Sequence, residues 1–179
     1  MLTLITALSA VPAAAAAQGH DHASPYVDLR DREVKALSAD DVDALLAGEG
    51  MGFALTAELN GYPGPKHVLE LADSLELTAE QRERTLAVMD AMAAEARELG
   101  ARLVDAERSF DQAFAEQTIR ADRVREAARA IGALRGELRA VHLAAHLSMM
   151  QILTRHQRHV YQELRGYGVA HDHHARETG

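Results

Sequence analysis

The sequence predicts an all-α protein built on a long antiparallel helical hairpin, and three observations lead to that class. The chain of 179 residues has only 4% aromatic residues and no tryptophan, a composition that favours helices packed through small side chains. Two long segments repeat their apolar residues every three or four positions, which is the spacing of one helix face. Two matching motifs, LTAEQ at Leu77–Gln81 and LTRHQ at Leu153–Gln157, mark the starts of two helices. Short helices are expected to flank the hairpin.

Residues 1–17 are typical of a secretory signal peptide. An apolar run leads to small residues with an Ala-x-Ala pattern, and cleavage is expected after Ala17. Because no lysine or arginine precedes the run, either the true start lies upstream or the signal is atypical; the alternative is a disordered, alanine-rich leader. The apolar run is too short to remain as a membrane span. The signal therefore predicts export to the periplasm.

Residues 18–37 are predicted to form a flexible arm, and residues 38–166 the helical domain. Ser38 can cap a short helix that runs to Ala47, with Asp41 three positions after the cap. Glycines end this helix, and a second short helix is expected at Phe53–Leu59. A third helix begins at Pro65 and carries apolar residues on one face up to the first motif.

Each of the two motifs has the pattern of a helix N-terminus. The threonine is a suitable N-cap, and the glutamine three positions later can bond back to the cap, which together form a capping box. The leucine before each threonine has no partner four residues into its own helix, because an arginine occupies that position. It is therefore expected to pack on another helix. The residues of the two motifs that take these roles are Leu77, Thr78, Gln81, Leu153, Thr154 and Gln157.

The hairpin itself is predicted from two apolar seams. The first helix should run from Ala79 to about Gln117, and Thr118 can cap the return helix, which ends before the second motif. The connection is short, so the two helices must be antiparallel neighbours. A last helix extends to about Gly166, and residues 167–179 are expected to form a disordered, histidine-rich tail.

Charge and composition exclude several functions. The net charge is −8, while residues 79–165 hold fourteen arginines against thirteen acids, so the acidity lies mainly before the hairpin. No basic cluster with interleaved aromatic residues suggests nucleic-acid binding. The chain has no cysteine, which removes disulfides and thiolate metal ligands. No Glu-x-x-His pattern, glycine-rich loop after a strand, or serine with an evident base indicates an enzyme.

Histidine is the outstanding excess, with ten residues in the chain. His142 and His146 are four positions apart on the return helix, so their rings lie on one face and can chelate one ion. Met150, four positions further, can add a thioether, and imidazole with thioether suits late first-row metals. The alternative is a pair of histidines at the edge of the core, with methionine filling space.

The remaining histidines allow two interpretations. The terminal groups can recruit metal loosely or are solvated chain ends, and His156 and His159 are expected at the surface. The terminal groups are His20, His22, His171, His173 and His174.

The two motifs, the hairpin between them and the helical run before the first motif resemble the periplasmic LTxxQ proteins. These include the Spy and CpxP chaperones and the CnrX-type and ZraP-type heavy-metal proteins. The resemblance covers roughly Tyr62 to Tyr167. It implies a hooked all-α hairpin that pairs into a homodimer and has no enzymatic activity. Proteins of this family bind unfolded clients, regulatory partners such as envelope sensors, metals, or both.

The resemblance also bears on the metal site. CnrX-type proteins carry a His-x-x-x-Met pair shortly before the second motif, and His146 with Met150 is similar, one residue out of register. The histidine pair that these relatives carry before the first motif is missing, and His67, followed by Glu70, stands in that region. His67 is therefore a candidate third ligand, the alternative being a solvent-facing histidine.

These observations lead to two functional predictions. The first is a periplasmic protein that binds or senses a divalent transition metal (zinc, nickel, cobalt or copper) through His142, His146, Met150 and His67, or acts as an ATP-independent chaperone, in heavy-metal resistance or envelope stress. The second is a metal-independent helical adaptor that regulates a sensor kinase or an anti-sigma factor.

Overall fold

A computed structural model describes residues 24–167, which form six α-helices and one short 3-10 helix and contain no β-strand. The expected signal peptide and the terminal histidine groups lie outside these residues. The described residues belong to two units, one ending at Arg30 with the 3-10 helix η1 (Val27–Leu29), the other beginning at Asp31 with all six α-helices. No helix within residues 24–167 is long and apolar enough to cross a membrane.

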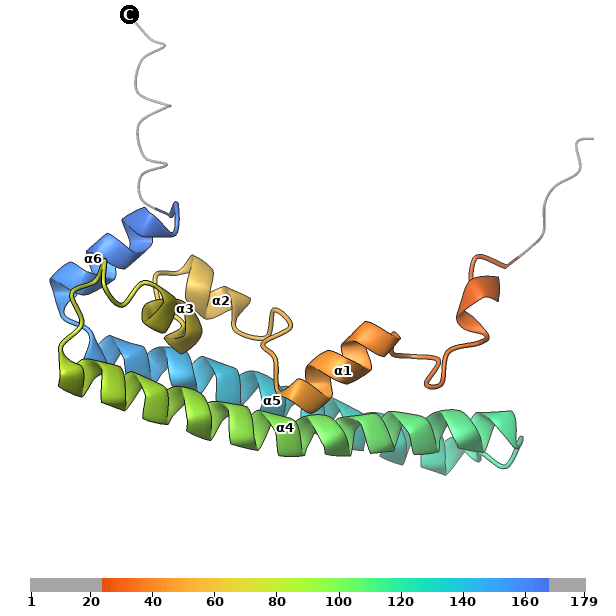
Figure 1. Ribbon diagram of the computed structural model, residues 1–179. Helices are drawn as coiled ribbons and strands as arrows, with labels where there is room; N and C mark the ends of the chain where they lie inside the picture. The colour runs from red at the N-terminus through yellow and green to blue at the C-terminus, as the bar shows by residue number, and fades with distance from the viewer. Residues whose placement is uncertain (1–23, 168–179) are drawn as a thin grey trace, which may run out of the picture. The chain divides into compact units, whose positions relative to one another are not determined.

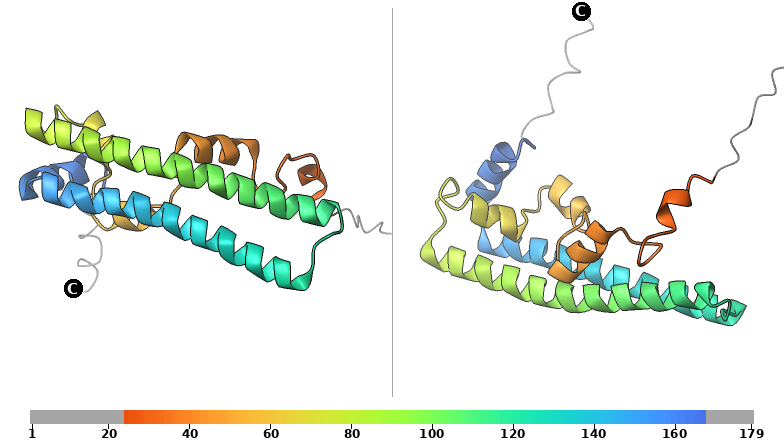
Figure 2. Two further views of the ribbon diagram at one scale, coloured as in Figure 1. Left: turned by 90° about the horizontal axis from the view of Figure 1, so that it is seen from below. Right: turned by 45° about the vertical axis from the view of Figure 1, so that its right-hand side comes forward.

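The predicted hairpin is confirmed as the longest part of the fold. Helices α4 (Ala79–Ala115) and α5 (Ala121–Ile152) run side by side in all the views of Figures 1 and 2. The prediction that Thr118 caps the return helix is wrong. Its hydroxyl donates to the carbonyl of Ala113 (3.3 Å) at the end of α4, and the N-cap of α5 is Arg120, which makes no side-chain cap bond.

Four short helices lie on one side of the hairpin (Figure 1). The predicted capping box of Ser38 and Asp41 is present at the start of the first of them. The third of them is shorter than expected, because it ends at Glu70 and turns follow it. Within these turns, Glu76 adopts a positive φ of 50° just before the first motif. The four helices are α1 (Ala39–Ala47), α2 (Leu55–Leu59), α3 (Pro65–Glu70) and α6 (Arg155–Leu164).

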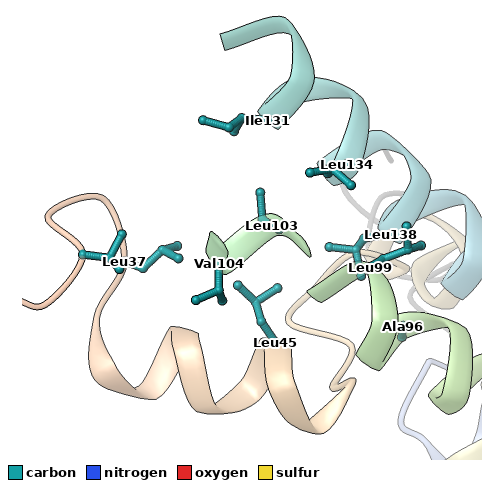
Figure 3. Close-up of a cluster of buried hydrophobic side chains, with 10 residues drawn as sticks. Leu37, Leu45, Ala96, Leu99, Leu103, Val104, Ile131, Leu134 and Leu138 are labelled. Carbon is teal, nitrogen blue, oxygen red and sulfur yellow. The ribbon is translucent and has the colours of Figure 1, made fainter. Parts of the chain in front are cut away.

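The first of two core clusters joins α1 to the middle of the hairpin (Figure 3). It contains Leu45 from α1, apolar residues 96–104 of α4 and 131–138 of α5. Val34 and Leu37 also belong to it, at 1% and 5% exposure, although they fall in the segment that was expected to be a flexible arm. The packed part of the chain thus begins before residue 38, because these two side chains cover α4 beside α1.

The second core cluster forms where the two motifs meet. Leu77 and Leu153, the leucines that precede the caps, are both buried there, together with Met149, Ile152 and Tyr161. The expectation that each leucine packs on another helix is therefore confirmed. Residues 68–75 of α3 and the following turns close the cluster from the other side.

Both motifs form the predicted capping boxes. The hydroxyls of Thr78 and Thr154 accept hydrogen bonds from the backbone N–H groups of Gln81 (3.1 Å) and Gln157 (3.2 Å). In return, each glutamine Oε1 accepts the N–H of its own cap, at 3.1 Å in the first motif and 2.9 Å in the second. Two otherwise unpaired N–H groups are satisfied at the start of each helix.

The same two glutamines also bind one another, which the motif pattern did not predict. Gln81 Nε2 donates to Gln157 Oε1 (2.8 Å), and Gln157 Nε2 donates to Gln81 Oε1 (2.9 Å). The second N–H of each amide reaches a backbone carbonyl, that of Ile152 (2.9 Å) for Gln81 and that of Leu75 (3.1 Å) for Gln157. This reciprocal amide pair fastens the start of α4, the start of α6, the end of α5 and the turn before α4 to one point.

A double-mutant cycle tests the amide pair. We expect Gln81→Ala and Gln157→Ala each to lower the free energy of unfolding by about 1–3 kcal/mol, because each leaves buried polar groups without partners. The coupling energy between them should be about 0.5–3 kcal/mol, measured by urea denaturation. The exposed pair of Gln112 and Glu116 on α4, whose side chains are 2.7 Å apart, is the control and should couple by only about 0.2–0.5 kcal/mol. Additive effects at Gln81 and Gln157 would contradict this role.

A second prediction concerns two helical glycines. A methyl group at Gly100 on α4 would collide with the backbone carbonyl of Leu45, because α1 crosses α4 at this residue. Gly100→Ala should therefore destabilise the protein by about 1–3 kcal/mol. Gly136 on α5 is the matched control: a Cβ there meets no atom within 4 Å, and Gly136→Ala should stabilise the protein by about 0.5–1 kcal/mol. Thermal melts that move in the same direction for both variants would contradict the assigned packing.

Candidate metal centre

A cavity of about 530 Å³ opens on the side of the hairpin that carries the short helices. It lies between the two core clusters. On α5 it is lined by His142 and His146, and on α4 by Met89 and Met92, while α2, α3, the end of α6 and the loop between α1 and α2 form the remaining wall. The cavity thus collects residues from six segments of the chain.

His142 is a buried, neutral imidazole. Its exposed fraction is 3%, its ring stacks on Phe53 with centroids 5.8 Å apart and planes 12° apart, and its Nε2 has no hydrogen-bond partner. Burial lowers its pKa, and the neighbouring charge of His146 lowers that pKa further. A neutral imidazole with an uncommitted nitrogen is the form that binds a metal ion.

His146 is held in one orientation by a backbone group. Its Nδ1 lies 2.7 Å from the carbonyl oxygen of Tyr62, and its exposed fraction is 8%. Because a carbonyl can only accept, Nδ1 must carry the proton in this contact, and in the neutral ring Nε2 then bears the lone pair. This is the arrangement that orients metal-binding histidines in general, where the second ring N–H donates to a carbonyl or carboxylate.

The apolar seam expected for α5 would place both histidines one step away from it, at the edge of the bundle, but the structure buries both. A strict alternation of threes and fours places Val141 in the seam after Leu138, but an α-helix turns once per 3.6 residues and its seam drifts. On α5 the buried positions step from Leu138 to His142 instead. Phe53, from the loop before α2, then covers the ring of His142.

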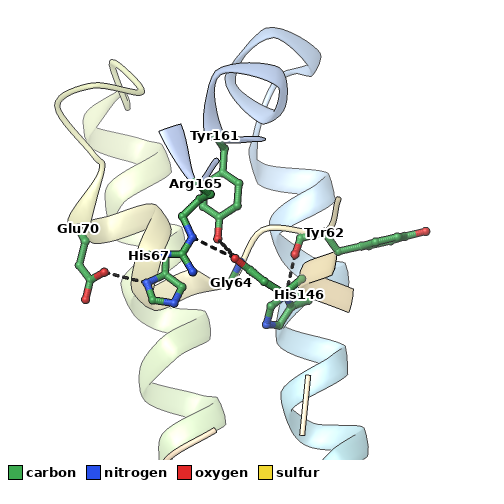
Figure 4. A network of polar contacts seen from close by, with 8 residues as sticks. Tyr62, Gly64, His67, Glu70, His146, Tyr161 and Arg165 are labelled. Carbon is green, nitrogen blue, oxygen red and sulfur yellow. Dashed lines mark hydrogen bonds and ion pairs between the residues drawn. The ribbon is translucent and has the colours of Figure 1, made fainter. Parts of the chain in front are cut away.

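Glu58 on α2 is a buried carboxylate that sequence reasoning missed. Its Oε1 accepts hydrogen bonds from the hydroxyl of Tyr161 (2.8 Å) and Nε of Arg165 (3.2 Å), both from the last helical segment (Figure 4). Its Oε2 has no hydrogen-bond partner and lies 3.8 Å from Nδ1 of His146. Burial, and then the bond to Glu58, raises the pKa of Tyr161, so the phenol remains a proton donor. The only sequence signal was an acid inside a short apolar helix.

The structure brings three of the four predicted metal ligands to the cavity. His67 lines it from α3, and its Nδ1 is paired with the carboxylate of Glu70 at 2.8 Å, which lowers the pKa of Glu70 (Figure 4). Met150 does not line the cavity. Within residues 24–167 no group of three or more His, Cys, Asp or Glu side chains is placed to hold one ion.

The fold and the cavity define a class of protein: a helical hairpin closed by two paired capping motifs, with imidazoles lining a cavity that opens on one side of the hairpin. Comparison with known families gives the narrower assignment. The profile described as LTXXQ motif family protein matches residues 65–165, more than half of the chain. The chain belongs to the LTXXQ motif family, as the resemblance of its two motifs indicates. No curated protein and no solved structure matches the chain.

Proposed function

We propose that this protein binds a transition-metal ion in the periplasm and that His142 and His146 hold the ion. The observation that carries the proposal is the hydrogen bond from His146 Nδ1 to the carbonyl of Tyr62, which leaves the lone pair of the neutral ring on Nε2. His142 supports it with a second buried imidazole one turn earlier on the same helix, whose Nε2 is unpaired. Zinc, nickel, cobalt and copper are the ions suited to such ligands.

His67 is the proposed third imidazole. It lies on the wall of the same cavity, and its contact with Glu70 through Nδ1 leaves Nε2 available. Met150 receives no ligand role in this proposal, because its side chain does not line the cavity.

The periplasmic location rests on the family and on the leader pattern of residues 1–17. Proteins with this hairpin are typically exported, and an imidazole site in that compartment would monitor or buffer metal outside the cytoplasm. The family resemblance also supports pairing into a homodimer and a partner in an envelope sensor system.

Calorimetry tests the metal proposal. The wild-type protein should bind one zinc or nickel ion that the variant His142→Leu/His146→Leu does not bind. Leucine at these positions keeps an apolar side chain in the buried space but removes the ligand nitrogens. The matched control is His156→Leu/His159→Leu, an exposed histidine pair on α6 that should leave this ion in place. Because all three proteins carry the terminal histidines, the difference in bound metal between them reports on the cavity alone.

The pH dependence of this binding follows from the burial of His142. Its lowered pKa keeps the imidazole neutral down to and below the ordinary histidine value of about 6.5. Affinity should therefore hold at pH 6.5 and above and decline at lower pH, as protons compete for the nitrogens. Equal metal binding by the wild type and the cavity variant would overturn the proposal and favour the metal-independent adaptor.

Chaperone action is a second candidate, supported by apolar side chains that the fold leaves exposed on the hairpin. Leu86 on α4 and Phe114 and Leu147 on the hairpin helices are each about half exposed. Arginines interspersed along both helices can offer charged heads and apolar stems to an unfolded client.

An aggregation assay tests this second function. The protein, in several-fold excess and without ATP, should slow the aggregation of a reduced model client, followed by light scattering. Leu86→Gln/Leu147→Gln should weaken the protection, because it removes apolar contact area, whereas His142→Leu/His146→Leu should retain it. If the wild type gives no protection, chaperone action is ruled out, and metal binding or adaptor function remain as the candidate functions.

A further inference from the structure

We propose that the preferred ion of this cavity is monovalent copper, Cu(I), bound by the thioethers of Met89 and Met92 together with the imidazole of His142. This inference rests on the proposed metal function and names the chemical class of the ion and the ligands from α4.

The methionines of the cavity differ from a methionine that fills a core. Met89 and Met92 are three positions apart on α4, so their side chains share one face, and both are partly exposed and line the cavity. Met149, in contrast, is 0% exposed and packs in the second core cluster. Met89 and Met92 therefore border open space instead of filling the core.

The cavity offers sulfur from one helix of the hairpin and nitrogen from the other. His142 and His146 line it from α5, the direct neighbour of α4. The loop between α1 and α2 adds a third thioether, that of Met51, whose backbone adopts a positive φ of 41° between two glycines. Thioethers are soft ligands that select Cu(I), whereas imidazole alone suits several divalent ions.

The charge of the wall also favours an ion of low charge. Glu58, whose Oε2 lies 3.8 Å from Nδ1 of His146, is already bonded through Oε1 to Tyr161 and Arg165. Lys66 and Arg165 place two positive charges on the same wall, beside Glu49 and Glu58. A divalent ion can be held by neutral imidazoles, but its desolvation costs more than that of a monovalent ion where no anionic ligand offsets it. A monovalent ion needs less compensation and can be held by neutral sulfur and nitrogen.

The unpaired nitrogen of His142 gives an independent indication of a ligand. Buried polar atoms without a partner are rare in folded proteins, and each asks for an explanation such as a bound ion or water. Nε2 of His142 is such an atom, on a residue that is only 3% exposed and lines the cavity. Ligation of Cu(I) satisfies it without requiring a proton donor.

Silver titration tests the inference, because Ag(I) has the ligand preference of Cu(I) and does not change oxidation state. With full-length protein, Met89→Leu/Met92→Leu should weaken Ag(I) binding at the cavity at least tenfold, while zinc affinity changes less than twofold. Met150→Leu is the matched control, because Met150 lies eight positions beyond His142 on the same helix but outside the cavity; it should bind both ions as the wild type does. Cu(I) added under anaerobic conditions should reproduce the pattern.

A spectroscopic measurement keeps the result specific to the cavity. In protein with ¹³C-labelled methionine methyl groups, Ag(I) should shift the signals of Met89 and Met92 and leave those of Met149 and Met150 in place. Unmoved Met89 and Met92 signals, with equal silver affinity in the Met89→Leu/Met92→Leu variant, would overturn the inference. The proposed function would still stand if His142→Leu/His146→Leu loses zinc, and both fail if neither pair of substitutions changes the binding of any ion.

Discussion

The reciprocal hydrogen bonds between Gln81 and Gln157 are the constraint on which the rest of the structure depends. A capping box normally completes one helix start, but here each box lends its glutamine to the other, so two helix starts separated by 76 residues are joined side by side. The same amides hold the end of α5 and the turn before α4 through backbone carbonyls. Tyr161, one turn beyond Gln157 on α6, is thereby placed to reach Glu58 above the cavity. The contact between Tyr161 and Glu58 at the cavity therefore follows from the paired motifs.

The local features of this fold could be predicted from the sequence because neighbouring residues encode them. The box at Ser38, the boxes of both motifs and the burial of Leu77 and Leu153 all depend on spacings of three or four positions. Glu58 could not be predicted, because its partners lie about a hundred positions later in the chain. Three of four proposed metal ligands do line one cavity, yet the burial of His142 was missed, since it comes from Phe53 covering the ring.

The cavity exists because the two core clusters do not meet. Along α5 the first cluster ends at Leu138 and the second includes Met149, and the positions between them that face inward are His142, Ala145 and His146. Imidazoles occupy two of these positions, and Nε2 of His142 has no hydrogen-bond partner. Gly64 allows the backbone to pass close to His146: an added Cβ would lie 3.0 Å from Cε1 and 3.2 Å from Nε2. A larger residue at Gly64 would press on the nitrogen that the proposed ion uses.

A metal ion at His146 would not act on that residue alone, because the turn around Gly64 connects the imidazole to α6. His146 Nδ1 donates to the carbonyl of Tyr62, and the N–H of Gly64, two residues later, donates to the hydroxyl of Tyr161 at 3.3 Å. Ligation at Nε2 withdraws electron density from the ring and makes the Nδ1 proton a stronger donor, which tightens the bond to the turn. This turn also positions the phenol of Tyr161, which binds Glu58. A change of occupancy in the cavity thus has a continuous polar route to the last helix, whose start is fixed by the glutamine pair and whose end is bonded to Glu58.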